Sequence, residues 1–174
     1  MSKLNNCIFL DRDGIINLNT GYINSIKKII WRKGIFKSIK FLKKRKFIIC
    51  VATNQSGIAR GFLTEKKLKE IHYYMNNVIF KKTGFRIDNF EYCPFHKESK
   101  INKYKKKSSR RKPSPGMILD YIKKNNLNKK NCIMIGDSNT DIQAAENANI
   151  DGYLIYGNKD IFPKIKKIIQ EKFD

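Results

Sequence analysis

The 174-residue sequence predicts an α/β fold built on a doubly wound parallel sheet. Short apolar runs of strand length alternate with longer segments whose apolar residues recur at helical spacing, as in parallel sheets with crossover helices. The chain has the usual length of one domain, and no internal repeat or linker divides it. We therefore expect one domain that spans residues 1–174.

Five apolar runs are expected to form the strands, at residues 7–10, 47–53, 90–93, 132–135 and 152–156. Five segments are expected to form helices, at residues 34–44, 64–82, 115–125, 139–148 and 161–173. The first helix would place five apolar residues near one face, namely Ile35, Phe36, Ile39, Phe41 and Leu42. The second begins with Thr64 and Glu65, a residue that caps helix N-termini followed by an acid that favours the first turn.

The segment 97–112 interrupts this alternation, because it carries nine basic residues and one acid with almost nothing to bury. We expect an exposed loop. The whole chain has a formal net charge of +22, and such a field attracts anions without selecting among nucleic acid, phosphorylated metabolites and acidic lipids. Since lysine recurs along the entire sequence, the charge also fits a general bias in composition.

No apolar run approaches the roughly 18 residues that a membrane-spanning helix needs, so no membrane partner is expected. The N-terminal stretch lacks the apolar core and the cleavage site of a secretory signal. The four cysteines are far apart in sequence and are expected to be reduced thiols rather than a disulfide framework. These features predict a cytoplasmic chain.

Acidic and small polar residues follow three of the expected strands. Asp11 and Asp13 follow the first, Thr53 stands with Asn54 and Gln55 at the end of the second, and Asp137 and Asp141 follow the fourth. Ligands of doubly wound sheets bind at these carboxyl ends. Clustered carboxylates repel one another unless a cation is present, and an all-oxygen site of this kind suits Mg²⁺.

This combination of residues suits phosphoryl transfer. An aspartate such as Asp11 can attack phosphorus that is held in line and whose charge is neutralised by Mg²⁺ and a lysine, for which Lys112 is the candidate. Asp13 could then protonate the leaving oxygen and later take a proton from water. The turn TNQSG offers backbone N–H groups that could hold a phosphate.

Four stretches, DRDGIIN, TNQSGIARG, RKPSPGM and GDSNTD, resemble the motifs of the haloacid dehalogenase-like phosphatases of the histidinol-phosphate type, subfamily IIIA. The resemblance implies a capless, Rossmann-like fold and an Mg²⁺-dependent phosphoric monoester hydrolase that works through an aspartyl-phosphate. TNQSGIARG followed by RKPxPGM is most similar to the branch that removes the 7-phosphate of D-glycero-D-manno-heptose 1,7-bisphosphate, a step in the synthesis of lipopolysaccharide precursors.

The resemblance also implies the site residues. Asp11 matches the nucleophile, Asp13 the acid/base whose carbonyl also faces Mg²⁺, Asp137 the third metal contact, and Thr53 and Lys112 the residues that stabilise the phosphoryl group. Arg111 matches the arginine that recognises the rest of the sugar phosphate, and Ser138 stands where relatives often have lysine. The full set of implied substrate-binding residues is Asn19, Thr20, Gly21, Tyr22, Asn54, Gln55, Ser56, Arg60, Arg111 and Ser138.

One departure from the family concerns zinc. Many relatives hold a structural zinc ion with a Cys-x-His pair and a later Cys-x-Cys pair. Here only Cys93 is in register, with Phe95, Ser108 and Arg110 at the other positions. We expect no zinc, because a structural site needs four ligands, and we expect a looser loop.

Three other functions stay open at this stage: a histidinol phosphate phosphatase, a polynucleotide 3′-phosphatase that would use the charge of +22, and a non-catalytic nucleic-acid-binding protein on this scaffold. The basic segment has no clear interleaving of aromatic residues, so we favour a small sugar bisphosphate over nucleic acid as the partner. We also expect a monomer, and we expect His72 and His96 at the surface or in loops. The anomer of the substrate is left open.

Overall fold

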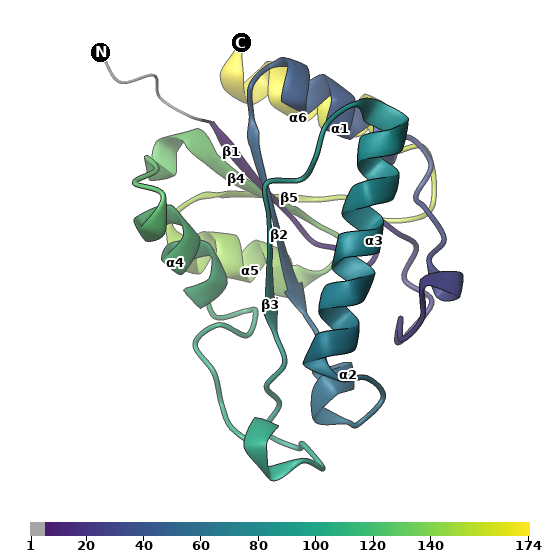
Figure 1. The fold of residues 1–174 in the computed structure, drawn as a ribbon. Helices are drawn as coiled ribbons and strands as arrows, with labels where there is room; N and C mark the ends of the chain where they lie inside the picture. Colours follow the sequence, from purple (N-terminus) through teal and green to yellow (C-terminus); the bar gives the residue numbers. More distant parts are fainter. Residues whose placement is uncertain (1–5) are drawn as a thin grey trace.

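In a computed structural model of the chain, residues 6–174 are described, and their strands form one five-stranded parallel sheet (Figure 1). Its members are β1 (Cys7–Leu10), β2 (Ile48–Asn54), β3 (Asn89–Cys93), β4 (Cys132–Gly136) and β5 (Asp151–Leu154). The order across the sheet is β3-β2-β1-β4-β5, and every neighbouring pair is parallel. β1 is therefore central, and its end is flanked by the ends of β2 and β4.

Helices cover both faces of the sheet (Figure 1). Side chains of α1 (Ile35–Lys44), α3 (Glu65–Thr83) and α6 (Phe162–Phe173) share one hydrophobic core with Ile8 and Leu10. Those of α4 (Gly116–Lys124) and α5 (Asn139–Ala148) share a second core with Cys7 and Phe9. Successive residues of β1 thus point to opposite faces, and both faces need apolar residues, which explains the continuous apolar run.

The prediction of an α/β doubly wound fold is confirmed, and the expected strands and helices lie within about two residues of those observed. The short α2 (Ser56–Ala59) and the 3₁₀ turns were not expected. Thr64 caps α3 by accepting a hydrogen bond from Lys67 N at 3.1 Å, as its position before Glu65 indicates.

The expectation that segment 97–112 buries almost nothing needs correction. Six of its lysines are exposed, but Ser99, Tyr104 and Lys112 are buried. A 3₁₀ turn at Asn102–Tyr104 brings the tyrosine ring inward, where it joins the core on the α3 side. The segment therefore has anchoring points that its charge pattern does not show.

His72 is a second correction, because its side chain is only 5% exposed. It lies on the buried face of α3 with Leu68 and Met75, and its ring stacks on Phe90 with centroids 4.7 Å apart. The i, i+4, i+7 spacing of Leu68, His72 and Met75 was the available sequence signal that His72 lies on the buried face of the helix. His96 lies in a loop, as expected.

All four cysteines are buried and free of disulfides. Within residues 6–174, every helix is too short or too polar to cross a bilayer. Residues 1–5, which form part of the N-terminal stretch considered for a secretory signal, lie outside the described residues.

Candidate active site

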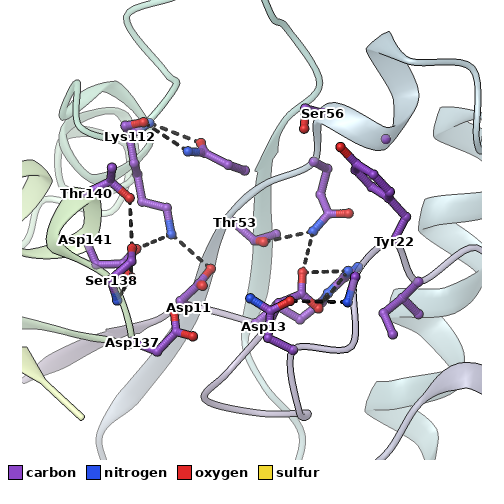
Figure 2. A pocket seen from close by; sticks show the side chains of 17 residues that line it. Asp11, Asp13, Tyr22, Thr53, Ser56, Lys112, Asp137, Ser138, Thr140 and Asp141 are labelled. Atoms are coloured by element: carbon purple, nitrogen blue, oxygen red, sulfur yellow. Dashed lines mark hydrogen bonds and ion pairs between the residues drawn. The ribbon is translucent and has the colours of Figure 1, made fainter. Parts of the chain in front are cut away.

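A cavity of about 440 Å³ opens where β1, β2 and β4 end (Figure 2). The parallel arrangement brings the three predicted polar clusters to this edge of the sheet. Its lining includes Asp11, Asp13, Asn19, Gly21, Tyr22, Thr53, Asn54, Gln55, Ser56, Lys112, Asp137, Ser138 and Asp141. Residues from distant parts of the sequence thus meet in one site.

Lys112 is the centre of the charge arrangement. Its side chain is buried, and its Nζ donates to Asp11 Oδ1 at 2.9 Å, to Ala52 O at 2.7 Å and to Asp141 Oδ1. Burial alone would lower the pKa of Lys112, but the carboxylates of Asp11 and Asp141 outweigh it, and the pKa is raised. Lys112 is therefore held as a cation beside Asp11.

Asp11 follows β1 directly, and its side chain is nearly enclosed. Burial raises the pKa of Asp11 to about 7, and Asp141 and Asp13 add to this effect while Lys112 opposes it. Lys112 thus compensates only part of the cost of a buried charge at Asp11. A second cation next to Asp11 would favour the carboxylate form that a nucleophile needs.

Three carboxylates provide a place for such a cation. Asp11, Asp137 and Asp141 each offer one oxygen, and these oxygens lie within 4.8 Å of one another. Burial also raises the pKa of Asp137, with Asp141 adding to the shift. A compact group of hard oxygen ligands whose negative charges repel one another fits Mg²⁺. Asp137 was expected to be a metal ligand, whereas Asp141 was noted at the strand end without being assigned to the metal.

Asp141 reaches this position through local structure. Its Oδ2 accepts hydrogen bonds from Ser138 N at 3.1 Å and Ser138 Oγ at 2.8 Å. The bond from Ser138 N belongs to a capping box at the start of α5. Gly136 makes room for it, since a Cβ there would lie 2.2 Å from Asp141 Cβ. The spacing of Ser138 and Asp141 was the available sequence signal for this cap.

Asp13 is held in a different way from Asp11. Its carboxylate accepts hydrogen bonds from Arg12 at 2.8 to 3.1 Å, from Asn17 Nδ2 at 2.9 Å and from Gln55 Nε2 at 3.0 Å. In Figure 2 it lies on one side of Asp11, while Asp137 and Asp141 lie on the other. Its carboxylate is therefore not part of the acidic cluster, and contact with a metal would involve its backbone carbonyl.

Arg12 was not expected to take part in the site. It is 1% exposed, it donates to Asp13, and its Nη1 lies 3.3 Å from His72 Nε2. Because arginine can only donate, His72 must accept at Nε2 and carry its proton on Nδ1. Burial, with a further effect from Arg12, lowers the pKa of His72 to about 3. Arg12 and His72 thus form a buried pair, and Arg12 holds the carboxylate of Asp13 in place.

The side-chain amides at the end of β2 are mainly engaged with the protein itself. Asn54 Nδ2 donates to Lys112 O at 3.0 Å, and Lys112 N donates to Asn54 Oδ1 at 3.1 Å. Gln55 Nε2 donates to Thr53 Oγ1 at 3.0 Å as well as to Asp13. Asn54 therefore fixes the backbone of Lys112, and Gln55 links Thr53 to Asp13.

The remaining expected substrate residues fall into two groups. Asn19, Gly21, Tyr22, Ser56 and Ser138 line the main cavity. Arg111 lines a neighbouring cavity of about 260 Å³ that also borders Lys112. The lining of the main cavity does not include Thr20 or Arg60.

Positive charge gathers around Arg111. Burial lowers the pKa of Arg111, and Arg60 lowers it further. Burial also lowers the pKa of His96, and the positive charges of Arg111 and Arg60 lower it further. The second cavity is lined in addition by Lys97, Lys106 and Lys107 and by no acid. This group of cations favours an anion next to the acidic cluster.

Comparisons with known proteins agree with this geometry. A model of the HAD-hydrolase-like family matches residues 109–161. A D-glycero-beta-D-manno-heptose-1,7-bisphosphate 7-phosphatase of Rhodopseudomonas palustris is 37% identical over 94% of this chain and 89% of its own length. The alpha-specific counterpart of Burkholderia mallei is also 37% identical, over 90% of this chain and 82% of its own.

Solved structures show the same similarity. The D,D-heptose 1,7-bisphosphate phosphatase of B. bronchiseptica, complexed with magnesium and phosphate, superposes with a TM-score of 0.81 at 26% identity, covering 95% of this chain and 99% of its own. A HAD-like phosphatase of Mesorhizobium loti gives a TM-score of 0.82 at 28% identity, covering 88% of this chain and 73% of its own.

Proposed function

Because the chain belongs to the D-glycero-D-manno-heptose 1,7-bisphosphate 7-phosphatases of the haloacid dehalogenase-like hydrolases, we propose that it hydrolyses the 7-phosphate of this sugar bisphosphate. The observation that carries the proposal is the arrangement of Asp11, Lys112 and the acidic cluster in one cavity. A nucleophile beside a buried cation and a metal-binding group of carboxylates suits phosphoryl transfer.

In the proposed reaction an oxygen of Asp11 attacks the phosphorus of the 7-phosphate, and the bond from phosphorus to the sugar oxygen breaks. Asp13, in its protonated form, gives the leaving oxygen a proton and is left as a carboxylate. That carboxylate takes a proton from water as the water oxygen attacks phosphorus, so that phosphate leaves and Asp11 is restored. Asp13 accepts hydrogen bonds from Arg12, Asn17 and Gln55, and these bonds suit its carboxylate form, which is the form that takes the proton from water in the second step.

The metal in this proposal is Mg²⁺, which the carboxylates of Asp11, Asp137 and Asp141 would hold. The carbonyl of Asp13 would be a further ligand. When bound, it would neutralise charge on the phosphoryl group. Magnesium is present with phosphate in the B. bronchiseptica structure, which supports this choice. Lys112 and Thr53 stabilise the same phosphoryl group from the side of β2, where Asn54 and Gln55 fix their positions.

Recognition of the second phosphate is assigned to the cations around Arg111. Arg60, Arg111 and the lysines of the second cavity would attract an anionic group that lies beyond the first phosphate. Asn19 to Tyr22, Ser56 and Ser138 would contact the sugar between the two phosphates. This division would favour a bisphosphate over a phosphate monoester whose other end carries no charge.

The proposal extends to the remaining features of the chain. We place it in the cytoplasm, as one domain and a monomer, with a small molecule rather than nucleic acid as its partner. We also propose that it binds no structural zinc. Cys93 is buried at the end of β3, and the positions that would complete the ligand set hold Phe95, Ser108 and Arg110.

The direct test is phosphate release, with Mg²⁺ and with EDTA, from the α and β anomers of heptose 1,7-bisphosphate, histidinol phosphate and a 3′-phosphorylated oligonucleotide. We expect Mg²⁺-dependent release to be fastest from one heptose anomer. A relative named for each anomer is 37% identical to this chain, so this assay also decides the anomer. Faster release from histidinol phosphate or the oligonucleotide would overturn the proposed substrate.

A further inference from the structure

A three-way contact at the start of α3 lies outside the active-site cavity. Glu65, the first residue of the helix, accepts a hydrogen bond from the Tyr104 hydroxyl at 2.7 Å and from the Tyr92 hydroxyl at 2.7 Å, one at each carboxylate oxygen. Lys103 Nζ lies 3.7 Å from the same carboxylate. We call Glu65, Tyr92 and Tyr104 the Glu65 clamp, because it ties α3, β3 and the basic segment together.

Charge makes this clamp important for the segment. Six exposed lysines, Lys97, Lys100, Lys103, Lys105, Lys106 and Lys107, repel one another and favour an extended, solvated chain. Tyr104 is the largest apolar side chain that the segment buries, and its hydroxyl is paired with Glu65. The hydrogen bonds from Tyr104 and Tyr92 lower the pKa of Glu65, so the clamp favours the carboxylate form.

A continuous set of contacts leads from the clamp to Arg111. The ring of Phe95 packs on Tyr104 with centroids 6.1 Å apart, and Tyr104 O accepts a hydrogen bond from His96 N at 3.1 Å. Arg111 Nη1 in turn donates to Phe95 O at 3.4 Å. The backbone that supports Arg111 is thus set by residues that pack on Tyr104.

We infer that Glu65, Tyr92 and Tyr104 are positioning residues that hold the basic segment so that Arg111 faces the second phosphate of the substrate. The inference rests on the proposed function for the identity of that anion. It assigns a role to the segment that its charge alone does not explain. The clamp acts through Phe95 and His96 and does not touch the substrate.

The first experiment removes one hydroxyl of the clamp. Tyr104→Phe keeps the ring that packs on Phe95 and loses the bond to Glu65, whereas Tyr73→Phe removes a hydroxyl from a 71% exposed tyrosine of α3 as a matched control. For Tyr104→Phe we expect KM for heptose 1,7-bisphosphate to rise about three- to tenfold. Turnover of 4-nitrophenyl phosphate, which has no second phosphate, should stay at the wild-type value.

The second experiment measures the segment directly. Trypsin should cleave after the lysines of residues 97–107 faster in Tyr104→Phe and Glu65→Ala than in the wild type. The rate for Glu65→Gln should lie between those of the wild type and Glu65→Ala, because glutamine keeps one acceptor oxygen. Glu70→Gln, on the exposed side of α3, is the control. Unchanged cleavage together with an unchanged KM would overturn the inference. If the wild type hydrolyses no sugar bisphosphate, the proposed function fails, while the cleavage rates still test the clamp.

Discussion

Among single residues, Asp11 has the clearest consequence for the chemistry. Asp11→Asn keeps the shape of the side chain but removes the nucleophilic carboxylate beside Lys112. We expect kcat to fall by at least about 10³-fold, since replacing a nucleophile removes the covalent route. Binding of substrate in the presence of Mg²⁺ should remain measurable by calorimetry, because the other groups of the cavity are unchanged.

The matched control is Asp174→Asn, which removes one negative charge from an exposed position far along the chain. It should leave kcat at the wild-type value. Normal turnover by Asp11→Asn would mean that the nucleophile is another group.

His72 links a single side chain to stability. Its pKa is lowered to about 3 by burial, whereas an unfolded histidine has a pKa of about 6.5. Between these values the unfolded chain binds a proton that the folded chain does not, so the free energy of unfolding falls as the pH decreases below 6.5. The stabilising contribution of neutral His72 is fully present above that pH.

We therefore predict a pH-dependent difference between the wild type and His72→Gln, whose side chain can still accept from Arg12 but does not titrate. From pH 6.5 downward, the wild type should lose about 1.4 kcal/mol per pH unit relative to the variant. Urea unfolding at several pH values between 7 and 4.5 measures this difference. If the free energy of unfolding of the two proteins changed with pH in the same way, the pKa of His72 would not be lowered by folding.

At the scale of elements, the end of β2 determines where the turn around Lys112 lies. Asn54 contacts the backbone of Lys112 through both the nitrogen and the oxygen of its side-chain amide. Asn54→Ala should therefore shift Lys112 and lower kcat about tenfold, with a loss of about 1 to 3 kcal/mol in the free energy of unfolding. Steady-state kinetics and chemical unfolding on the same preparation test both effects.

The chain contains a matched control for this prediction. Asn76 makes the same two-point contact with the backbone of Ile87, far from the cavity. Asn76→Ala should cost a similar amount of stability and leave kcat unchanged. If both variants lost the same activity, the effect of Asn54 would be general destabilisation rather than the position of Lys112.

The elements themselves were largely predictable from sequence, and the reason is physical. Strands buried on both faces, such as β1 and β4, need continuous apolar runs, and these runs are visible without any structure. The convergence of Asp11, Thr53 and Asp137 then follows from the parallel order of the strands. Local patterns do not show long-range partners.

The unexpected features all depend on such partners. Nothing near Arg12 in the sequence indicates that it contacts His72, sixty positions away. The basic composition around Tyr104 likewise conceals its bond to Glu65. Asn54 and Asp141 both contact Lys112, which is distant from Asn54 in sequence, and local patterns do not indicate these contacts.

At the scale of the whole molecule, the chain has a formal net charge of +22, whereas its candidate active site contains a cluster of aspartates. A positive field favours the approach of a bisphosphate, and the acidic cluster provides the local exception where a cation can bind. The same field makes stability depend on ionic strength, because like charges over the surface repel one another in the folded state. Any effect of Mg²⁺ on stability must therefore be separated from simple screening.

We predict that Mg²⁺ raises the melting temperature beyond what ionic strength does. A ligand that binds only the folded chain adds about 2.7 kcal/mol at 100 times its Kd, which corresponds to about 5 to 10 °C for a chain of this size. Scanning calorimetry with Mg²⁺, and with EDTA plus NaCl at equal ionic strength, measures the specific part. Asp137→Asn should lose most of that part, because one of the three clustered carboxylates is gone. An equal melting temperature in both buffers would mean that the aspartates relieve their repulsion through Lys112 alone, without a metal.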